Sequence, residues 1–371
     1  MATYAISDIH GALDEFKALL RKIGFRPDGS DELYLLGDFG DWGARSLETI
    51  LFIKELAEAC PHVHPLMGNH ELMFLTTILS GYKEGDDDPN ALNWLYADHG
   101  LVTWKAYLGL TDKEKSDLAL WLHSLPLSAT VKIGEGKPRT YMLAHAYPYH
   151  YDQVGTEEEA LQRRVDAVWR RLMLREDPFA DYRGSEHYDM FVCGHTITDY
   201  YYGVLRLERN WPYRKPGEYV RNRIFRGERF INIDCGAKCM DYDMDSREII
   251  QLAALRAQLA ALRLEDEKAF YVRRAPIHLP DITLPEIAFP EFTMPELRMP
   301  EVSLPNLPNI QSLAGRQRLY EIPKWFGLPG KLSAEELERI LSMAGEPYFR
   351  GTIRRREEGD PKREDRTTKE E

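Results

Sequence analysis

The chain has 371 residues and a net charge of -12, with 43% hydrophobic and 29% charged residues. This balance is typical of a globular protein. The chain is acidic and its basic residues form no stripe ahead of the C-terminus, so we expect neither nucleic acid nor an anionic membrane surface as a partner. Because no apolar stretch approaches the ~20 residues that span a bilayer and a strand begins almost at the N-terminus, we expect a cytoplasmic protein without a leader.

The N-terminal part alternates between strand and helix patterns. Short apolar runs predict strands at 2–7, 32–36 and 63–67. Apolar residues at helical spacing predict helices at 13–23 and 47–56, and Gly24 ends the first of them. This alternation indicates an α/β protein with a largely parallel sheet, in which functional side chains gather beyond the carboxyl ends of the strands.

The middle of the chain continues with both kinds of element. We expect helices across 72–125, at 157–176 and at about 246–258, and strands at 129–133, 140–144, 189–193 and 229–233. A hairpin over 259–273 then closes the first domain, which we place at residues 1–275. The arginines of the 157–176 helix are interpreted as a solvated face.

The composition changes after residue 275. Proline recurs every five residues from Pro280 to Pro305, which forbids a helix or a central strand and predicts an extended arm at 276–310. A short helical segment at 311–350 and a charged, disordered tail at 351–371 follow. The arm is either a stiff spacer or a recognition element that binds a protein partner.

Four short runs carry the chemistry, and each follows a predicted strand. They are Asp8-Ile9-His10-Gly11, Gly37-Asp38-Phe39-Gly40-Asp41, Gly68-Asn69-His70-Glu71 and Gly194-His195-Thr196, with His145 between the last two. Asp, His and Asn in this order predict ligands for two divalent cations, either Mn, Fe or Zn. A hydroxide that bridges such a pair is nucleophilic near neutral pH, because metal binding lowers the pKa of water from ~15.7 to about 7. The runs therefore predict phosphoester hydrolysis.

Each residue of these runs has an expected role. Asp38 is the natural bridge, because its carboxylate has two oxygens to share between the cations. Asp8 and His10 complete one site, and Asn69, His145 and His195 complete the other. His70 is the candidate general acid for the leaving group, and Asp41 would hold its imidazole in the right tautomer and keep it charged.

These runs, together with Leu125-Pro126-Leu127 and Ile233-Asp234-Cys235-Gly236, resemble the calcineurin-like metallophosphoesterase superfamily. The resemblance is greatest to its bacterial-type serine/threonine phosphoprotein phosphatase branch. It implies a β-sandwich core flanked by helices, a dimetal site, and one-step hydrolysis of phosphoserine or phosphothreonine in proteins without a phosphoenzyme. It also implies the same ligand assignment, with His70 and Asp41 protonating the leaving group.

The chain departs from this branch at one position that matters. The branch usually has an arginine that grips the phosphate where this chain has Trp42, and an indole supplies neither the charge nor the planar fork of a guanidinium. Arg175 is our candidate for the missing role, with Arg45 as a helper. Alternatively, Trp42 stacks against an aromatic or nucleobase leaving group.

Two other functions compete with a protein phosphatase. A hydrolase of dinucleoside polyphosphates or other nucleotides has the same fold, although symmetrical dinucleoside tetraphosphatases usually lack the carboxylate that Asp41 provides here. The third alternative is a scaffold or binding protein with a vestigial metal site, in which the proline-rich arm docks a partner.

Overall fold

The computed structural model describes residues 1–149, 157–180, 187–208, 221–241 and 256–274. The predicted arm, the helical segment and the charged tail lie outside these ranges, as does almost all of the predicted 246–258 helix. Within the described part, every helix is too short or too polar to cross a bilayer.

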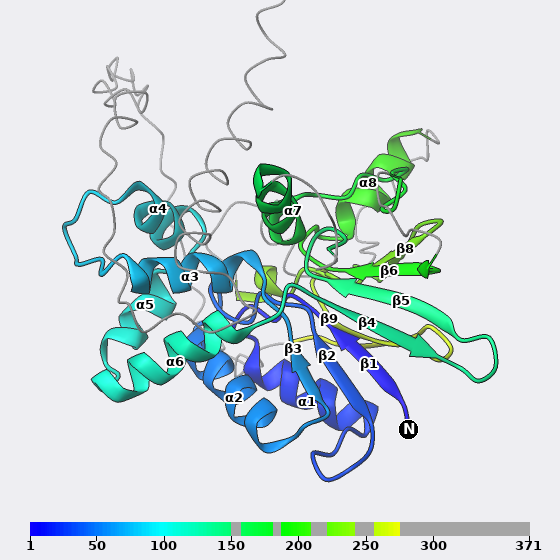
Figure 1. Ribbon diagram of the computed structural model, residues 1–371, viewed down its shortest axis with the longest axis horizontal. Helices are drawn as coiled ribbons and strands as arrows, with labels where there is room; N and C mark the ends of the chain where they lie inside the picture. Colours follow the sequence, from blue (N-terminus) through cyan, green and yellow to red (C-terminus); the bar gives the residue numbers. More distant parts are fainter. Residues whose placement is uncertain (150–156, 181–186, 209–220, 242–255, 275–371) are drawn as a thin grey trace, which may run out of the picture. The chain divides into compact units, whose positions relative to one another are not determined.

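The first sheet has five strands in the order β10-β9-β1-β2-β3 (Figure 1). Three neighbouring strands of it are parallel, with the third at the edge: β1 (Thr3–Ile6), β2 (Glu32–Leu35) and β3 (Val63–Pro65). The predicted closing hairpin is β9 (Leu259–Arg263) and β10 (Lys268–Val272), and β9 pairs antiparallel with β1. Because the three parallel strands point the same way, the loops that follow them meet at one edge.

The second sheet also has five strands, in the order β4-β5-β6-β8-β7. β5 and β6 are parallel and so are β6 and β8, while β4 and β7 pair antiparallel at the two edges. The bounds of the strands are Ser128–Ile133 for β4, Arg139–Ala144 for β5, Met190–Cys193 for β6, Phe225–Arg226 for β7 and Phe230–Asn232 for β8. Only the two-residue strand β7 was missed by the sequence pattern.

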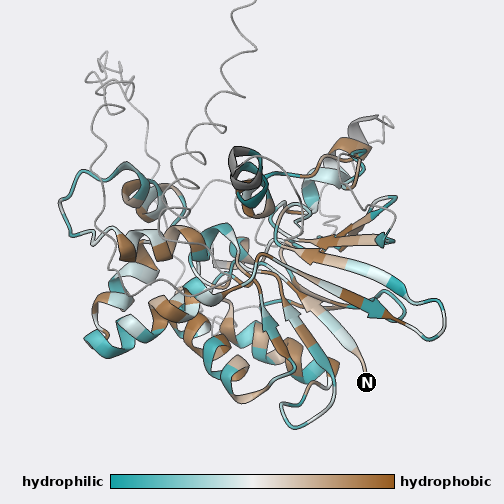
Figure 2. Cartoon of the chain, in the orientation of Figure 1, coloured by the Kyte–Doolittle hydropathy of each residue, from teal (hydrophilic) through white to brown (hydrophobic). Residues whose placement is uncertain are grey.

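The two sheets pack face to face through a buried apolar layer. Ala5 of β1 and Leu262 of β9 lie in one cluster with Leu143 of β5, Val192 of β6 and Ile231 of β8. Burial of such a layer is the main favourable contribution to a sandwich. In Figure 2 brown segments alternate with paler and teal ones along the strands, whereas the loop between β4 and β5 is teal. The predicted α/β fold with a β-sandwich core flanked by helices is therefore confirmed.

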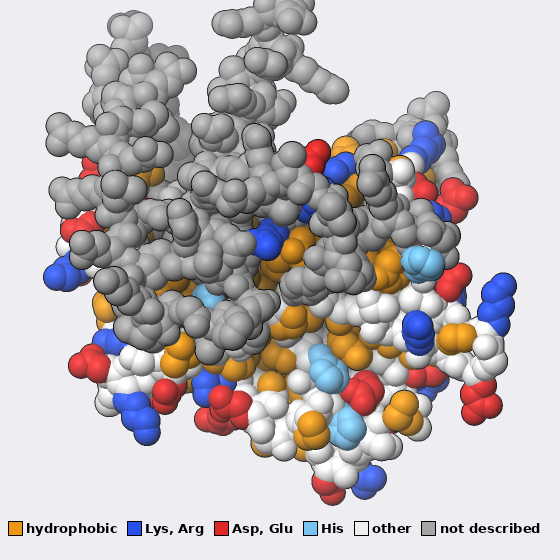
Figure 3. Space-filling model, viewed as in Figure 1, with side chains coloured by type: hydrophobic (Ala, Val, Ile, Leu, Met, Phe, Trp, Pro, Cys, Tyr) orange, Lys and Arg blue, Asp and Glu red, His pale blue; other side chains and the backbone are white. Residues whose placement is uncertain are grey.

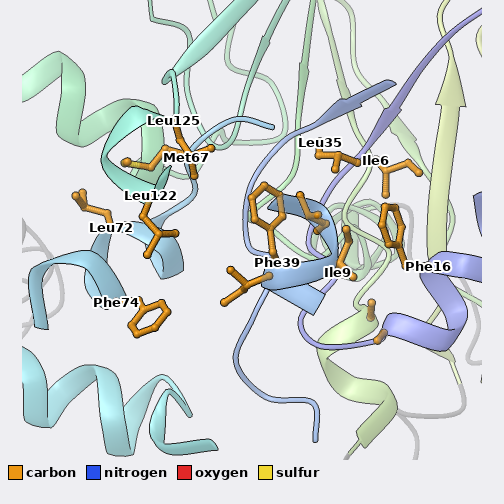
Figure 4. Close-up of a cluster of buried hydrophobic side chains, with 14 of the residues drawn as sticks. Ile6, Ile9, Phe16, Leu35, Phe39, Met67, Leu72, Phe74, Leu122 and Leu125 are labelled. Carbon is orange, nitrogen blue, oxygen red and sulfur yellow. The ribbon is translucent and has the colours of Figure 1, made fainter. Parts of the chain in front are cut away.

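Helices α1 (Leu13–Ile23) and α2 (Ser46–Ala59) cover the outer face of the first sheet (Figure 4). Phe16 and its neighbours recur at helical spacing and pack on Ile6 and Leu35 of the strands. Gly24 ends α1 in the left-handed region, at φ 73°, as the sequence predicted.

The region predicted as helical over 72–125 consists of several pieces. They are α3 (Asn69–Leu79), α4 (Pro89–Leu92), the π-helix η1 (Asn93–Ala97), α5 (Leu101–Leu108) and α6 (Asp112–Ser124). A capping box of Thr111 and Glu114 begins α6. The π-helix places Trp94 in the core against the loop that carries Asp41, which matters for the site below.

Three helices of the described part also differ from the prediction. Helix α7 (Glu157–Trp169) ends seven residues before the predicted position, and its last carbonyl, at Trp169, accepts a hydrogen bond from His195. Helix α8 (Asp199–Glu208) and the 3₁₀ helix η3 (Ala237–Asp241) were not predicted. Because α7 ends early, the residues that follow it can turn toward the site.

Candidate dimetal centre

The loops after β1 and β2 adopt an unusual backbone conformation. Asp8, His10 and Asp38 have φ of 53°, 47° and 57°, in the left-handed region that costs an L-residue roughly 1–2 kcal/mol. Backbone hydrogen bonds between the loops hold them there, from Asp8 N to Gly37 O (3.1 Å) and from His10 N to Asp38 O (3.0 Å). The conformation turns three candidate ligands toward one another.

The loop after β3 is joined to the loop after β2 by Glu71. Its buried carboxylate accepts hydrogen bonds from the backbone N–H groups of Asp38 (2.7 Å), Phe39 (2.7 Å) and Gly68 (3.0 Å). Burial, together with the charge of Asp38, raises the pKa of Glu71 to about 7. The sequence analysis gave Glu71 no role, although it stands within the third run.

Two glycines are required by close contacts with the ligands. A Cβ at Gly68 would lie 2.4 Å from Asp38 Oδ1, and one at Gly194 would lie 1.9 Å from Asp8 Oδ2. Any side chain at either position would displace a carboxylate. Close packing against the ligands, as well as the turn, therefore requires glycine at each position.

One group of donors surrounds the Oδ2 atom of Asp38. His10 Nε2 lies 3.5 Å from it and His70 Nε2 lies 3.8 Å from it. The donor atoms of these three buried residues lie within 4.8 Å of one another, close enough to share one cation. Asp8 Oδ1 is 3.9 Å from His10 Nε2, and the Asp8 carboxylate also accepts the backbone N–H of His195.

A second group of donors surrounds the other oxygen of the same carboxylate. His145 Nε2 lies 3.4 Å from Asp38 Oδ1, 3.0 Å from Asn69 Oδ1 and 3.2 Å from His195 Nδ1. Asp38, His145 and His195 form the second cluster that could hold a cation. Asp38 thus offers one oxygen to each group, which is the arrangement expected of a bridging ligand.

Backbone carbonyls orient three of the histidines. His10 donates from Nδ1 to Gly40 O (3.0 Å), and His145 donates from Nδ1 to Leu36 O (2.8 Å). His195 donates from Nε2 to Trp169 O (3.1 Å). In each ring the other nitrogen is then left on the side of Asp38, where a metal ligand must lie. The residues present therefore fit two divalent cations.

The electrostatics suit the same role. Burial lowers the pKa of His10 and of His195 well below the ordinary value, so both rings stay neutral, which is the ligand form. Although burial opposes it, the nearby Asp38 carboxylate raises the pKa of His145 to about 9. The surrounding histidines hold the pKa of Asp38 well below its usual range despite its burial.

His70 forms a buried pair with Asp41. Its Nδ1 donates to Asp41 Oδ2 at 2.6 Å, and Trp94 Nε1 donates to the same oxygen at 2.6 Å. The Thr103 hydroxyl donates to the other oxygen, Oδ1. Asp41 therefore has fixed partners on both oxygens, and its geometry is that of a group that orients His70.

The residues predicted to contact substrate lie in different surroundings. The Trp42 ring stacks on His99, with ring centres 3.7 Å apart. Arg45 pairs on the surface with Asp14 and Glu48, at 2.6 Å each. Arg175 is exposed on the turn after α7, and its role in binding phosphate stays a prediction.

Arg171 belongs to the site, although the sequence analysis placed it on a solvated face. It donates to the carbonyl of His195 (3.0 Å) and to the hydroxyl of Thr196 (3.3 Å). Arg171 is exposed as expected, but it is not helical, because α7 ends at Trp169 and Arg171 then contacts the loop of His195. The only signal in the sequence was its place in a run of arginines, which does not distinguish it.

The sequence profile of the calcineurin-like phosphoesterase family matches residues 1–202 of this chain. That match covers more than half of the sequence and includes every candidate ligand found above. The chain belongs to the calcineurin-like phosphoesterase family, and it is a metallophosphoesterase by class.

Several curated proteins are similar to it. A symmetrical bis(5'-nucleosyl)-tetraphosphatase from Actinobacillus pleuropneumoniae serotype 5b (strain L20) is 32% identical over 182 residues, which cover 49% of this chain and 56% of the relative. One of the same name from Glaesserella parasuis serovar 5 (strain SH0165) is 28% identical over 238 residues, covering 63% and 72%. The chain thus spans little more than half the length of the first relative.

Among solved structures, a protein serine/threonine phosphatase from Saccharomyces cerevisiae is similar with a TM-score of 0.46 and 13% sequence identity. The similar part covers 76% of this chain and 82% of the yeast chain.

Proposed function

We propose that this protein is a dimetal-dependent hydrolase of dinucleoside polyphosphates, the alternative that the sequence analysis placed second. The observation that carries the substrate class is the similarity to symmetrical bis(5'-nucleosyl)-tetraphosphatases at 32% and 28% identity. The observation that carries the chemistry is the Asp38 carboxylate, which offers one oxygen to each of two histidine-rich donor groups.

Asp38, with His10 and Asp8 on one side and Asn69, His145 and His195 on the other, would hold the two cations. When bound, these cations activate water and neutralise the charge of the phosphate oxygens. The protein holds the donors in place through Glu71 and the histidine–carbonyl hydrogen bonds. Arg171 adds a fixed positive charge beside His195.

His70 would give a proton to the departing oxygen. Its Nε2 faces the donor groups, while its Nδ1 is held by Asp41. A positioned acid of this kind contributes typically ~10²–10⁴-fold to a rate. Because His70 Nε2 is also close enough to Asp38 to act as a ligand, its role as the acid is part of the proposal.

A serine/threonine protein phosphatase remains the second candidate, and one observation favours it. The sequence analysis took the carboxylate at Asp41 as a mark of that branch, and in the structure Asp41 binds His70 at 2.6 Å. A scaffold with a vestigial site is the third candidate, and the complete donor set speaks against it.

The first experiment is to remove metal with a chelator and to add back Mn²⁺. Initial rates are then compared on diadenosine tetraphosphate, a phosphothreonine peptide and p-nitrophenyl phosphate, with Asp38→Asn as the blank. We expect a metal-dependent preference for the dinucleotide. A preference for the peptide would show that the protein is a protein phosphatase instead. If no substrate were turned over above the blank, the scaffold function would be the remaining candidate.

The proline-rich arm is a separate proposal. We keep the boundaries 1–275, 276–310, 311–350 and 351–371, and we propose that the arm is the segment through which a protein partner would bind. Deletion of residues 276–371 tests this. The proposal fails if the truncated protein keeps its activity, its thermal stability and every partner recovered with the full chain.

A further inference from the structure

Lys238 is a half-buried lysine that the sequence analysis did not single out. It lies on η3, and its Nζ is 5.2 Å from the centre of the Trp42 ring. His99 also stacks on that ring. Within the described ranges no carboxylate lies within ion-pair distance of Lys238, although its charge opposes the burial that raises the pKa of Asp234. Its ammonium group lies against the face of an aromatic ring.

The ammonium is close to the candidate metal centre. The loop that carries Trp42 is bound to the first ligand loop, because Gly43 N donates to His10 O at 3.2 Å. Asp41, the residue before Trp42, binds His70 Nδ1 at 2.6 Å. Because Trp42 stands between Asp41 and Gly43, Lys238 lies beside a loop that contacts two histidines of the candidate centre.

We propose that Lys238 is a substrate-binding residue, whose ammonium group donates a hydrogen bond to a non-bridging phosphoryl oxygen at the dimetal centre. Trp42 is its positioning residue, because the face of the indole attracts the ammonium and fixes it beside the site. A cation–π contact of this kind favours the side-chain conformation that keeps the ammonium over the ring. The inference rests on the proposed phosphoester hydrolysis and not on the identity of the leaving group.

This assignment explains how a tryptophan can stand beside the centre without supplying charge itself. An indole cannot neutralise phosphate, but a lysine held on it can do so as a point charge with three donors. Lys238 would then join Arg171, whose guanidinium already contacts the His195 loop, as the second cation at the centre. Two cations beside the donor groups suit a substrate that carries several negative charges.

The test compares Mn²⁺-loaded wild type with Lys238→Met and Lys238→Arg. The matched control is Lys132→Met, which removes an exposed lysine of β4 at the end of the strand pair away from His145. Turnover of p-nitrophenyl phosphate is measured with inorganic phosphate as a competitive inhibitor. For Lys238→Met we expect at least a tenfold loss of kcat/KM and at least a fivefold weaker inhibition by phosphate, with unchanged metal content. Lys238→Arg should stay within threefold of wild type.

The role of Trp42 is tested in the same assay. Trp42→Leu keeps the lysine but removes its support, so we expect KM to rise more than kcat falls. The double variant with Lys238→Met should be no worse than Lys238→Met alone, because the ring acts through the lysine. Additive losses in the double variant would contradict the positioning role.

Two results would overturn the assignment of Lys238. One is a Lys238→Met variant within twofold of Lys132→Met in both kcat/KM and phosphate inhibition. The other is an equal loss of metal or of Tm in Lys238→Met and Lys238→Arg, which would mark a structural role. If the wild type prefers the phosphopeptide, only the substrate class fails. If it hydrolyses nothing, calorimetric titration of Mn²⁺-loaded wild type and Lys238→Met with inorganic phosphate still decides the role of Lys238.

Discussion

The carboxylate of Glu71 binds the backbone N–H of Asp38 at 2.7 Å, and it also accepts the N–H of Phe39. The proposed bridging ligand is therefore positioned by the third run as well as by its own strand. Asp38 has a φ of 57°, which is unfavourable for an L-residue, and these hydrogen bonds offset that cost. Glu71 connects the loops after β2 and β3 at the point where the two donor groups meet.

We predict that Glu71→Gln weakens metal binding by about 10–100-fold, as is typical when a group behind the ligands is lost. The amide keeps one acceptor but places an NH₂ group against backbone donors. The measurement is a Mn²⁺ titration with Tm recorded in parallel. Glu48→Gln, which changes an exposed carboxylate, is the control and should match wild type. Equal metal affinity in all three proteins would contradict the role of Glu71.

The His70–Asp41 pair predicts a particular pH dependence. Burial alone lowers the pKa of His70, but the charge of Asp38 and the hydrogen bond to Asp41 raise it to about 9. An acid must be protonated to act, so activity should persist below this pKa and fall as the pH rises through it.

Asp41→Asn removes a charge and should shift the alkaline limb of the kcat profile to lower pH, with a lower maximal rate. The measurement is kcat against pH at constant ionic strength with saturating Mn²⁺. Substrates with good and poor leaving groups provide the control, since only a poor leaving group needs a proton from the general acid. An unshifted limb in Asp41→Asn would mean that His70 is not the acid.

The contact between Gly194 and Asp8 predicts a steric effect. Gly194→Ala would place a Cβ where the structure has Asp8 Oδ2, 1.9 Å away. We therefore expect at least a tenfold loss of metal affinity and a lower Tm. Gly203→Ala is the matched control, because nothing lies within 4 Å of its added Cβ. In a helix that change should raise stability by about 0.5–1 kcal/mol. A Gly194→Ala protein with wild-type metal affinity would contradict the packing described here.

The sequence pattern placed the candidate ligands at one edge of the sheet for a physical reason. Asp8, Asp38 and Asn69 each follow one of the three parallel strands of the first sheet, so a local pattern of strand and loop was enough to predict that they lie together. The structure brings them together with His145 and His195 from the second sheet.

The sequence could not reveal the groups that support these ligands. Trp94 and Thr103 bind Asp41 from 53 and 62 residues away, and no local pattern marks such a contact. Arg171 was misplaced because no glycine or proline signals the end of α7. Lys238 depends on a 3₁₀ helix that follows the sheet, which periodicity does not detect.

A histidine–carboxylate cluster near the start of β2 predicts an effect of acid on stability. Glu32 accepts hydrogen bonds from His62 (2.8 Å) and His64 (2.6 Å), and Figure 3 shows histidines beside a carboxylate on this face. Although partial burial opposes it, these hydrogen bonds hold the pKa of Glu32 below its ordinary value of 4.5.

A carboxylate with a lowered pKa stabilises the fold above its unfolded-state pKa, and this contribution is lost as the pH falls through the folded-state pKa. We therefore expect the difference in Tm between wild type and Glu32→Gln to be largest near neutral pH and to shrink below pH 4.5. Thermal unfolding across pH 3–7 measures it. Glu265→Gln, at an exposed turn, is the control. A difference that grows toward low pH would contradict this interpretation.

The central claim is that Asp38 joins two cations in a phosphoester hydrolase. The most direct test measures bound Mn²⁺ per chain and turnover of diadenosine tetraphosphate in the same samples, for wild type and Asp38→Asn, during stepwise addition of metal. We predict two cations per wild-type chain, with turnover rising as the second binds. For Asp38→Asn we predict weakened binding at both sites and at least a hundredfold loss of rate. Wild-type stoichiometry and rate in Asp38→Asn, or turnover by the metal-free protein, would contradict the account.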